Sequence, residues 1–306
     1  MNSSAHQPPQ IARANGIDIC YEIFGDAGAE PMLLIMGLGA QMILWDDEFC
    51  RELAARGFRV IRFDNRDIGK SGRLSGGKRL TLIELLKLRF LKIPVAAPYK
   101  IHDMAEDTTG LMDALGIKSA HIVGASMGGM IAQEIAISFP HRVRSLTSIM
   151  STTGNPKVPP PTREAAAMLM APPPTTREEY LIRFAKTWKV LRVGSFPLDE
   201  AKDLERAERT FERGLNPNGV GRQLRAILAS GSRKQRLHAV RAPTLVIHGT
   251  VDPLVRPEGG KDTAASIPGA RLLMIEGMGH AIPIPMWPEI IGAIEKHAHG
   301  AVAKAA

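Results

Sequence analysis

Apolar and polar positions in the first half of the chain alternate between strand-like and helix-like periods. Residues 17–24 follow a period of two, which predicts a strand, and residues 32–36 form a continuous apolar run, as in a strand buried on both faces. The same reasoning predicts further strands at residues 59–63, 121–123 and 145–150. Helices are predicted between them at residues 43–56, 102–115 and 127–139. This rhythm indicates βαβ units and a mostly parallel central sheet flanked by helices.

The rhythm breaks after Met150. Residues 151–241 open with proline clusters and then carry helix-length stretches at 177–192, 199–213 and 221–230, without a convincing strand. Alternation returns with strands at 244–248 and 271–275 and helices at 260–266 and 288–297, and the tail from Ala298 is expected to fray. We therefore predict an α/β core made of residues 1–150 and 242–306, with an all-helical insertion at 151–241.

The length and composition indicate a globular fold of the size of an enzyme. The chain has 306 residues, of which 44% are hydrophobic. No apolar run reaches the roughly 18 residues that span a bilayer, and the first ten residues are polar and contain prolines, so we expect a cytoplasmic protein without a membrane span. The two cysteines, Cys20 and Cys50, are too few for a disulfide framework or a metal site and are expected to be buried thiols.

The net charge of +8 is concentrated in the insertion. Residues 151–241 contain 17 Lys and Arg against 9 Asp and Glu, a difference of +8, so the rest of the chain is neutral. Basic and acidic side chains interleave there, for example in Asp203–Arg209, which is typical of a solvated helix face and not of a phosphate-binding strip. We predict no nucleic-acid partner, and attraction to an anionic substrate or a membrane surface stays an alternative.

Ser126 is the candidate nucleophile. It lies in Gly124-Ala-Ser-Met-Gly128, a G-x-S-x-G pattern between a predicted strand and a predicted helix. In such a turn the hydroxyl is lifted above a parallel sheet, and small flanking residues prevent collision. The pattern alone is weak because glycine and serine are common, so the prediction depends on a base and an acid elsewhere in the chain.

Asp252 and His280 are the candidate partners of Ser126. They follow the last two predicted strands, in the chain order serine, aspartate, histidine. Parallel sheets of this type place their sites at the carboxyl ends of the strands, so the three side chains are expected to meet there. An imidazole can then remove the serine proton while the carboxylate orients it. The alternative position for the carboxylate, after the strand that ends at Met150, offers no candidate, because residues 151–162 contain no Asp or Glu. A plain Asp-Pro turn and an ordinary loop histidine are the alternatives.

Two backbone N–H groups are candidates for an oxyanion hole, which acyl transfer needs for its developing negative charge. One belongs to Met127, directly after the nucleophile, and the other to Leu38 in the glycine-containing loop Met36–Gly39. Backbone donors do not depend on residue identity, so the alternative for these residues is an apolar pocket wall.

No cofactor or metal site is predicted. Gly37-Leu-Gly39 lacks the third glycine of a dinucleotide-binding loop, because Met42 stands in its place. Residues 72–78 nearly match a phosphate-binding loop, but Arg79 replaces the required Ser or Thr and no strand leads into it. His248 is expected to be structural, and the other histidines show no spacing typical of metal ligands beyond the terminal pair His297 and His299.

With these motifs in place, the chain resembles the α/β-hydrolase superfamily from about Ile17 to His297. The resemblance rests on the serine turn, on Gly249-Thr-Val-Asp252 and Gly277-Met-Gly-His280, and on Phe63–Ser71, where Asp67 replaces a commoner glycine. Met36-Gly37, Trp45–Phe49 and the segment before His280 are similar to the aclacinomycin methylesterase branch, which cleaves a methyl ester from a polyketide. The family often has His-Gly where this chain has Met36-Gly37, which keeps the backbone donor but changes the side-chain hydrogen bonds of the loop.

The resemblance implies a serine carboxylic-ester hydrolase with residues 151–241 as a lid. Serine at the turn, in place of the aspartate of dehalogenases and epoxide hydrolases, favours esters, lactones and thioesters; a lactonase, a C–C bond hydrolase or lyase, and a non-catalytic receptor are the alternatives. Candidate pocket residues are Met36, Met168, Phe184 and Trp188, which could instead only seal the lid against the core. Residues 80–99 are a candidate second wall. The expected partner is a small or medium, largely apolar ester, and a monomer and a homodimer are both compatible with the sequence.

Overall fold

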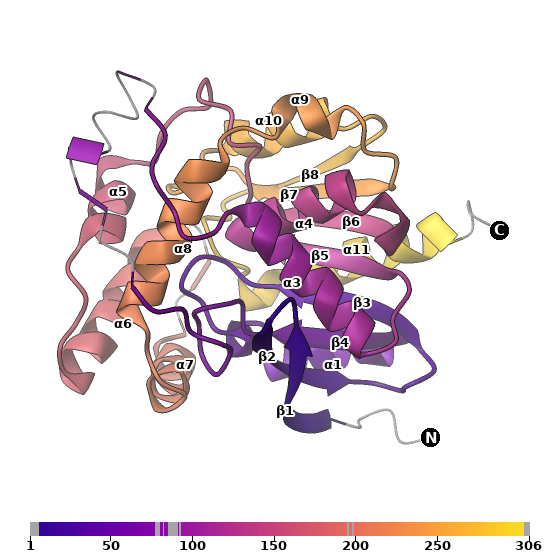
Figure 1. Cartoon of the computed structure of the whole chain (residues 1–306), viewed down its shortest axis with the longest axis horizontal. Coiled ribbons are helices and arrows are strands. Elements are labelled where there is room, and N and C mark those ends of the chain that lie inside the picture. The colour runs from indigo at the N-terminus through magenta and orange to yellow at the C-terminus, as the bar shows by residue number, and fades with distance from the viewer. Residues whose placement is uncertain are drawn as a thin grey trace.

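The computed structural model describes residues 6–76, 80–81, 83–84, 91, 93–194, 196–197 and 199–302. An eight-stranded sheet forms its centre (Figure 1). The strands are β1 (His6–Ala14), β2 (Ile17–Phe24), β3 (Glu30–Ile35), β4 (Phe58–Phe63), β5 (Ala120–Ala125), β6 (Val143–Ile149), β7 (Thr244–Gly249) and β8 (Arg271–Ile275). They stand in the order β1-β2-β4-β3-β5-β6-β7-β8. Only β1–β2 and β2–β4 pair antiparallel, which confirms the mostly parallel sheet.

Helices cover both faces of this sheet. The core helices are α1 (Asp47–Ala55), α3 (Ile101–Ala114), α4 (Met127–Ser138), α9 (Lys234–Leu237), α10 (Pro257–Ser266) and α11 (Trp287–Val302), with short 3₁₀ turns η1 (Met42–Leu44), η3 (Pro140–Arg142) and η4 (Ile284–Met286). Leu33 and Ile35 of β3 face the cluster that contains α3 and α4. Met32 and Leu34 face the cluster that contains α1 and α11. Burial of both faces explains why this strand is one continuous apolar run.

Four helices make up most of the insertion between β6 and β7. They are α5 (Arg163–Met170), α6 (Arg177–Leu191), α7 (Glu200–Glu212) and α8 (Pro217–Ser230), and they lie together at the left of the sheet in Figure 1. Within the described part of residues 151–241 there are helices and no strand, as predicted. The short helix α9, which falls in the same range, contacts α4 and α10, and Leu237 is part of the core.

Several predicted boundaries are wrong. Strand β1 was not predicted, because its exposed, proline-containing sequence lacks an apolar period, and its pairing with β2 is interrupted between Gln7 and Gln10. Helix α8 begins at Pro217, where Asn216 caps the helix, four residues before the predicted start. Helix α11 continues to Val302 and does not fray from Ala298. Helix α5 was also missed, and much of residues 77–92, on which the phosphate-loop and second-wall predictions partly fall, lies outside the described residues.

Basic residues of α7 and α8, and Arg213 at the C-cap of α7, pair with acidic residues of the core. Arg206 contacts Asp46, Arg209 lies 3.4 Å from Asp47, Arg213 lies 2.5 Å from Asp64, and Arg222 lies 2.6 Å from Asp67. We call these four contacts the cap–core ion pairs. The side chains of Arg206, Arg213 and Arg222 are only 11%, 13% and 4% exposed, so the prediction of a solvated helix face is wrong for them.

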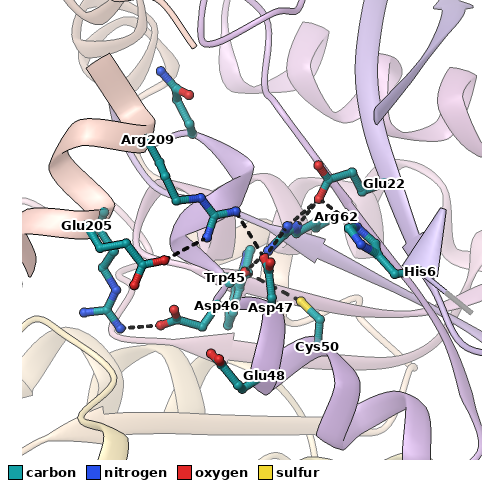
Figure 2. A network of polar contacts seen from close by, with 12 residues as sticks. His6, Glu22, Trp45, Asp46, Asp47, Glu48, Cys50, Arg62, Glu205 and Arg209 are labelled. Carbon is teal, nitrogen blue, oxygen red and sulfur yellow. Dashed lines mark hydrogen bonds and ion pairs between the residues drawn. The ribbon is translucent and has the colours of Figure 1, made fainter. Parts of the chain in front are cut away.

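Figure 2 shows how one of these pairs continues into the core. Asp47 lies between Arg209 of the insertion and Arg62 of β4, which it contacts at 2.6 Å. Arg62 is fully buried and also donates to Glu22 and to the Trp45 carbonyl. A buried arginine needs such partners, because an unpaired charge in the interior is costly. The fold thus extends an ionic network from the sheet to the insertion.

Both cysteines are buried free thiols, as the sequence predicts. Burial raises the pKa of the Cys50 thiol to about 12, so it stays protonated at neutral pH. Among the helices that the structure describes, none is both long enough and apolar enough to cross a membrane.

Candidate active site

The turn at Ser126 joins β5 to α4 in a strained conformation. Ser126 has φ 56° and ψ −119°, a region that residues other than glycine rarely adopt. A Cβ atom on Gly124 would lie 2.1 Å from the Gly128 carbonyl oxygen, and one on Gly128 would lie 2.0 Å from the carbonyl oxygen of Ile35. Only glycine fits at these two positions, which explains the spacing of the motif. Ser126 itself is half-buried, whereas its neighbours are buried.

Ser126, His280 and Asp252 form one chain of hydrogen bonds. His280 Nε2 lies 2.9 Å from Ser126 Oγ, and His280 Nδ1 lies 2.7 Å from Asp252 Oδ2. A carboxylate only accepts hydrogen bonds, so Nδ1 carries the proton and Nε2 is free to accept the serine hydroxyl. The structure brings together the three side chains that the sequence proposed, from three separate loops of the chain.

The carboxylate of Asp252 is held in place by its own loop. Its Oδ1 accepts hydrogen bonds from the backbone N–H groups of Leu254 and Val255, both at 2.9 Å, and the residue is fully buried. His248 lies 3.5 Å from Asp252 Oδ2 and hydrogen-bonds the Val255 carbonyl oxygen at 2.8 Å. Burial lowers the pKa of His248, so it packs as a neutral side chain behind the carboxylate.

The loop Met36–Gly39, which we call the oxyanion loop, lies against the serine. A Cβ atom on Gly37 would lie 3.1 Å from Ser126 Cβ and 3.6 Å from Ser126 Oγ. The Ala40 N–H group donates to the Gly37 carbonyl oxygen at 3.3 Å, and Gly39 has φ 69°, as a turn with glycine at its third position requires. Of the two predicted donor residues, Leu38 is the second residue of this turn, and Met127 is the first residue of α4 and follows Ser126 directly; their role as oxyanion-hole donors stays a prediction.

The four candidate pocket residues are spread over three parts of the chain. Met36 is 8% exposed at the start of the oxyanion loop, and Met168 is half-buried on α5. Phe184 and Trp188 lie one turn apart on α6, with ring centroids 5.8 Å apart, and the Arg192 guanidinium lies over the Trp188 ring. Phe184 is buried whereas Trp188 is half-buried. Their role as pocket residues stays a prediction.

A cavity of about 210 Å³ lies beside the histidine loop. Gly279 and Ala281, which flank His280, form one wall together with residues 282–285. Arg192, Phe196, Pro197, Asp199 and Arg206 of the insertion form the other. None of the four predicted pocket residues is among the described residues that line it. No pattern in the sequence indicated this cavity, because its two walls are far apart in the chain.

Two buried amides next to the site were also not predicted. Asn65 Nδ2 donates to the Met36 carbonyl oxygen at 2.9 Å, and Gln223 Oε1 accepts from the Gly39 N–H group at 2.9 Å. Asn65 follows the end of β4, so a polar residue at the carboxyl end of a strand was an available signal. Gln223 lies inside α8, where nothing in the sequence distinguishes it from a surface glutamine.

Protein metal centres are built from clusters of His, Cys, Asp and Glu side chains. Within the described residues there is no group of three or more such side chains that could hold a metal ion.

Residues 30–285 match the family described as the α/β hydrolase fold. Rhodomycin D methylesterase DnrP of Streptomyces peucetius is 29% identical to this chain, over 96% of this chain and 99% of the relative. This similarity confirms the resemblance to the methylesterase branch.

Two solved structures show the same fold at low sequence identity. The enol-lactonase from Burkholderia xenovorans LB400 has a TM-score of 0.69 at 21% identity, covering 96% of this chain and 100% of that one. The meta-cleavage product hydrolase CumD from Pseudomonas fluorescens IP01, in a mutant form complexed with acetates, has a TM-score of 0.73 at 20% identity, covering 98% and 99%. The family and the relative confirm the prediction of a hydrolytic enzyme. On its fold, its motifs and this similarity, the chain is a member of the α/β-hydrolase family.

Proposed function

We propose that this protein is a carboxylic-ester hydrolase that works through a serine acyl-enzyme, with Ser126, His280 and Asp252 as its catalytic triad. The observation that carries the proposal is the unbroken chain of hydrogen bonds from Ser126 Oγ through His280 to Asp252. The similarity to a methylesterase over nearly the whole chain supports an ester as substrate.

The proposed first half-reaction forms the acyl-enzyme. Ser126 Oγ attacks the ester carbonyl carbon while its proton moves to His280 Nε2. The carbonyl oxygen takes up the negative charge, and collapse of the tetrahedral intermediate expels the alcohol, which receives the proton from His280 Nε2. Asp252 keeps the imidazole of His280 oriented and stabilises the imidazolium cation. The two backbone hydrogen bonds that Asp252 accepts fix its carboxylate in the position that this role requires.

The second half-reaction returns the enzyme to its starting state. A water molecule gives a proton to His280 Nε2 and attacks the acyl carbon, and the proton then returns to Ser126 Oγ as the carboxylic acid leaves. We assign the N–H groups of Leu38 and Met127 to the oxyanion in both halves. The closeness of Gly37 to Ser126 supports this assignment.

We propose residues 151–241 as a lid over the site, next to a core of residues 1–150 and 242–306. The contact between the α6 end and the histidine loop supports this, since the His280 N–H group donates to the Leu191 carbonyl oxygen at 2.6 Å. Met36, Met168, Phe184 and Trp188 are proposed to offer apolar surface to the substrate. A small or medium, largely apolar ester suits such a site, and the cytoplasmic location expected from the sequence is part of the same proposal.

Turnover of p-nitrophenyl esters of increasing acyl length by the wild type and by Ser126→Ala tests the proposal. We expect the wild type to release p-nitrophenol in a chain-length-dependent manner and Ser126→Ala to lose at least about a thousandfold in kcat, because removal of a triad member leaves only the contribution of binding and the oxyanion hole. The same pair of proteins is assayed on a γ-lactone and on a vinylogous 1,5-diketone. A wild type that is inactive on all esters, or a Ser126→Ala variant that is equally active, would overturn the proposal. Hydrolysis of only the lactone or only the diketone would show that the substrate is a lactone or a C–C bond and not an open-chain ester.

A further inference from the structure

The oxyanion loop is held at both ends by side-chain amides from different parts of the fold. At its first residue, the Met36 carbonyl oxygen accepts a hydrogen bond from Asn65, which belongs to the core. At its last residue, the Gly39 N–H group donates to Gln223 Oε1, at 2.9 Å, and Gln223 belongs to α8 of the insertion. Gly37 and Leu38 lie between these two fixed points.

Gln223 is itself fixed by a second hydrogen bond. Its Nε2 donates to the Arg66 carbonyl oxygen at 2.9 Å, and the residue is fully buried. The oxygen and the nitrogen of the amide therefore each have a protein partner, which sets the orientation of the side chain. Because the residue is buried, water cannot replace either partner. The side chain acts as a rigid bridge between the loop after β4 and the loop after β3.

Helix α8 contacts Gly39 in two ways. Val220 lies one helical turn before Gln223 and so on the same face of α8. A Cβ atom on Gly39 would lie 3.1 Å from Val220 Cγ2, so the helix packs directly on the glycine. At φ 69° this position also favours glycine for its conformation. The end of the oxyanion loop is thus enclosed by α8 through both apolar packing and a hydrogen bond.

We infer that Gln223 is a positioning residue of the insertion that sets the geometry of the oxyanion hole by holding the Gly39 end of the oxyanion loop. The inference rests on the proposed function, since it needs an oxyanion hole that includes the Leu38 N–H group. Hydrogen-bond donors stabilise an oxyanion only when they are already at the right place, and a shift of about 1 Å in catalytic geometry costs about a hundredfold in rate.

The consequence is that the insertion contributes to catalysis as well as covering the site. Arg222, next to Gln223, forms a buried bidentate pair with Asp67, at 2.8 and 2.6 Å, and this anchors the same turn of α8 to the core. The anchor and the bridge come from adjacent residues. A lid that moved as one unit away from the core would therefore have to release the Gly39 N–H group.

Gln223→Met tests the inference, because methionine keeps the length and volume of the side chain but cannot hydrogen-bond Gly39. We expect kcat on a p-nitrophenyl ester to fall about 10- to 100-fold, with KM changed less than about twofold, since the loss falls on the transition state. The rate at which a p-nitrophenyl phosphonate modifies Ser126 should fall in the same proportion, because its phosphoryl oxygen occupies the same hole as Ser126 Oγ displaces p-nitrophenolate.

Gln133→Met is the matched control. Gln133 is an equally buried glutamine that also contacts the 151–241 segment, but its side-chain bonds go to Ser148 and Arg233. We expect Gln133→Met to lose about as much thermal stability as Gln223→Met, as for removal of a structural hydrogen bond. Its kcat should stay within about threefold of the wild type. If Gln223→Met does not fold, Gln223→Asn, which keeps the amide but shortens its reach by one methylene, is measured in its place.

The outcomes separate the inference from the proposed function. If Ser126→Ala is inactive while Gln223→Met, or its Asn substitute, keeps wild-type kcat and phosphonate reactivity, the inference is wrong and the proposed function stands. A loss of kcat no larger than that of Gln133→Met, or a change in KM alone, also overturns it. If Ser126→Ala keeps full activity, the proposed function fails and takes the inference with it.

Discussion

The backbone N–H group of His280 donates to the Leu191 carbonyl oxygen, with 2.6 Å between the two atoms. Leu191 is the last residue of α6, and the carbonyl groups in the last turn of a helix have no hydrogen-bond partner within the helix. The N–H group of His280 provides that partner for Leu191. The residue proposed as the general base is thereby held on its backbone side by the insertion and on its side-chain side by Asp252.

Gly279→Ala should disturb this contact. The added Cβ would lie 2.3 Å from the Leu191 carbonyl oxygen and 2.9 Å from that of Val193, so either the histidine loop or the end of α6 must move. We expect at least a tenfold lower kcat/KM on a p-nitrophenyl ester, on the order of what small displacements of catalytic groups cost. In Gly300→Ala, the control, the new methyl group meets nothing within 4 Å, and activity should not change. Equal activities of the two variants would contradict the prediction.

Asp252→Asn should leave the fold intact and remove most of the activity. The asparagine Oδ1 can still accept from Leu254 and Val255, but the amide nitrogen then faces His280 Nδ1 and favours the wrong tautomer. We expect kcat to fall by about 10³ to 10⁴, as for loss of the orienting carboxylate in a triad. Steady-state kinetics beside a circular dichroism melt make the comparison, and a loss below tenfold would argue against this acid.

Replacing the strained serine by glycine should stabilise the fold relative to replacing it by alanine. Ser126 and an alanine in its place both carry a Cβ at φ 56°, whereas glycine adopts this conformation without strain. We expect Ser126→Gly to have a free energy of unfolding about 1 kcal/mol higher than Ser126→Ala, after the greater chain entropy of glycine is allowed for. Urea unfolding of the two inactive proteins measures it. A less stable glycine variant would show that the turn stores no strain.

Asp67→Gly introduces the residue that is commoner in the family and should still destabilise this protein. Asp67 has φ 72°, so glycine would relieve the backbone, but it would also leave the buried Arg222 without its anionic partner and with only the Gly76 carbonyl oxygen. Burial alone would raise the pKa of Asp67, yet hydrogen bonds from Arg222, Leu74 and Tyr99 lower it, so the carboxylate is charged and paired.

We expect Asp67→Gly to lose about 3 to 5 kcal/mol of unfolding free energy, the usual cost of breaking a buried pair from one side. The double variant Asp67→Gly with Arg222→Met should recover part of that loss, since no buried charge is then left alone. A double-mutant cycle by urea unfolding measures the coupling. If the double variant loses the sum of the free energies that the two single variants lose relative to the wild type, the two residues are not coupled.

His297 should make part of the stability depend on pH. Burial, with Arg271 beside its Nδ1, lowers the pKa of His297 to about 4, and its Nε2 donates to the Leu146 and Pro243 carbonyl oxygens as a neutral ring. Between pH 4 and 6.5 the unfolded chain binds a proton here that the folded chain does not. The neutral His297 ring therefore makes its full contribution to the free energy of unfolding above pH 6.5, and this contribution is lost as the pH falls towards 4.

The size of this effect follows from the shift, at about 3 kcal/mol over the window. Urea unfolding of the wild type and of His297→Gln at pH values of about 4.5, 5.5 and 7, which bracket the titration, measures it. The difference in unfolding free energy between the two proteins should shrink as the pH falls. A difference that stays constant across this range would mean that the folded and unfolded chains bind this proton equally, so that burial does not lower the pKa of His297.

The sheet and the meeting of Ser126, His280 and Asp252 could be predicted because each depends on local order in the sequence. Continuous apolar runs such as residues 32–36 identify buried parallel strands, and strand ends locate Ser126, Asp252 and His280 at one edge of the sheet. Strand β1 could not be predicted, because it lies at the edge with little apolar surface and is defined by its pairing with β2. The same holds for Gln223, whose meaning depends on a contact with Gly39, 184 positions away in the sequence.

The cap–core ion pairs constrain how this enzyme can be re-engineered. The segment with an excess charge of +8 is matched to acidic residues that lie outside it, on the loop after β4 and at the start of α1. A chimera that exchanges residues 151–241 for a segment without basic residues at these places would leave Asp46, Asp47, Asp64 and Asp67 without these cations. Grafting the insertion onto a scaffold without acidic residues at these places would in turn bury unpaired arginines. An exchange of the insertion therefore has to keep both sides of these ion pairs, so its arginines and the four aspartates have to move together.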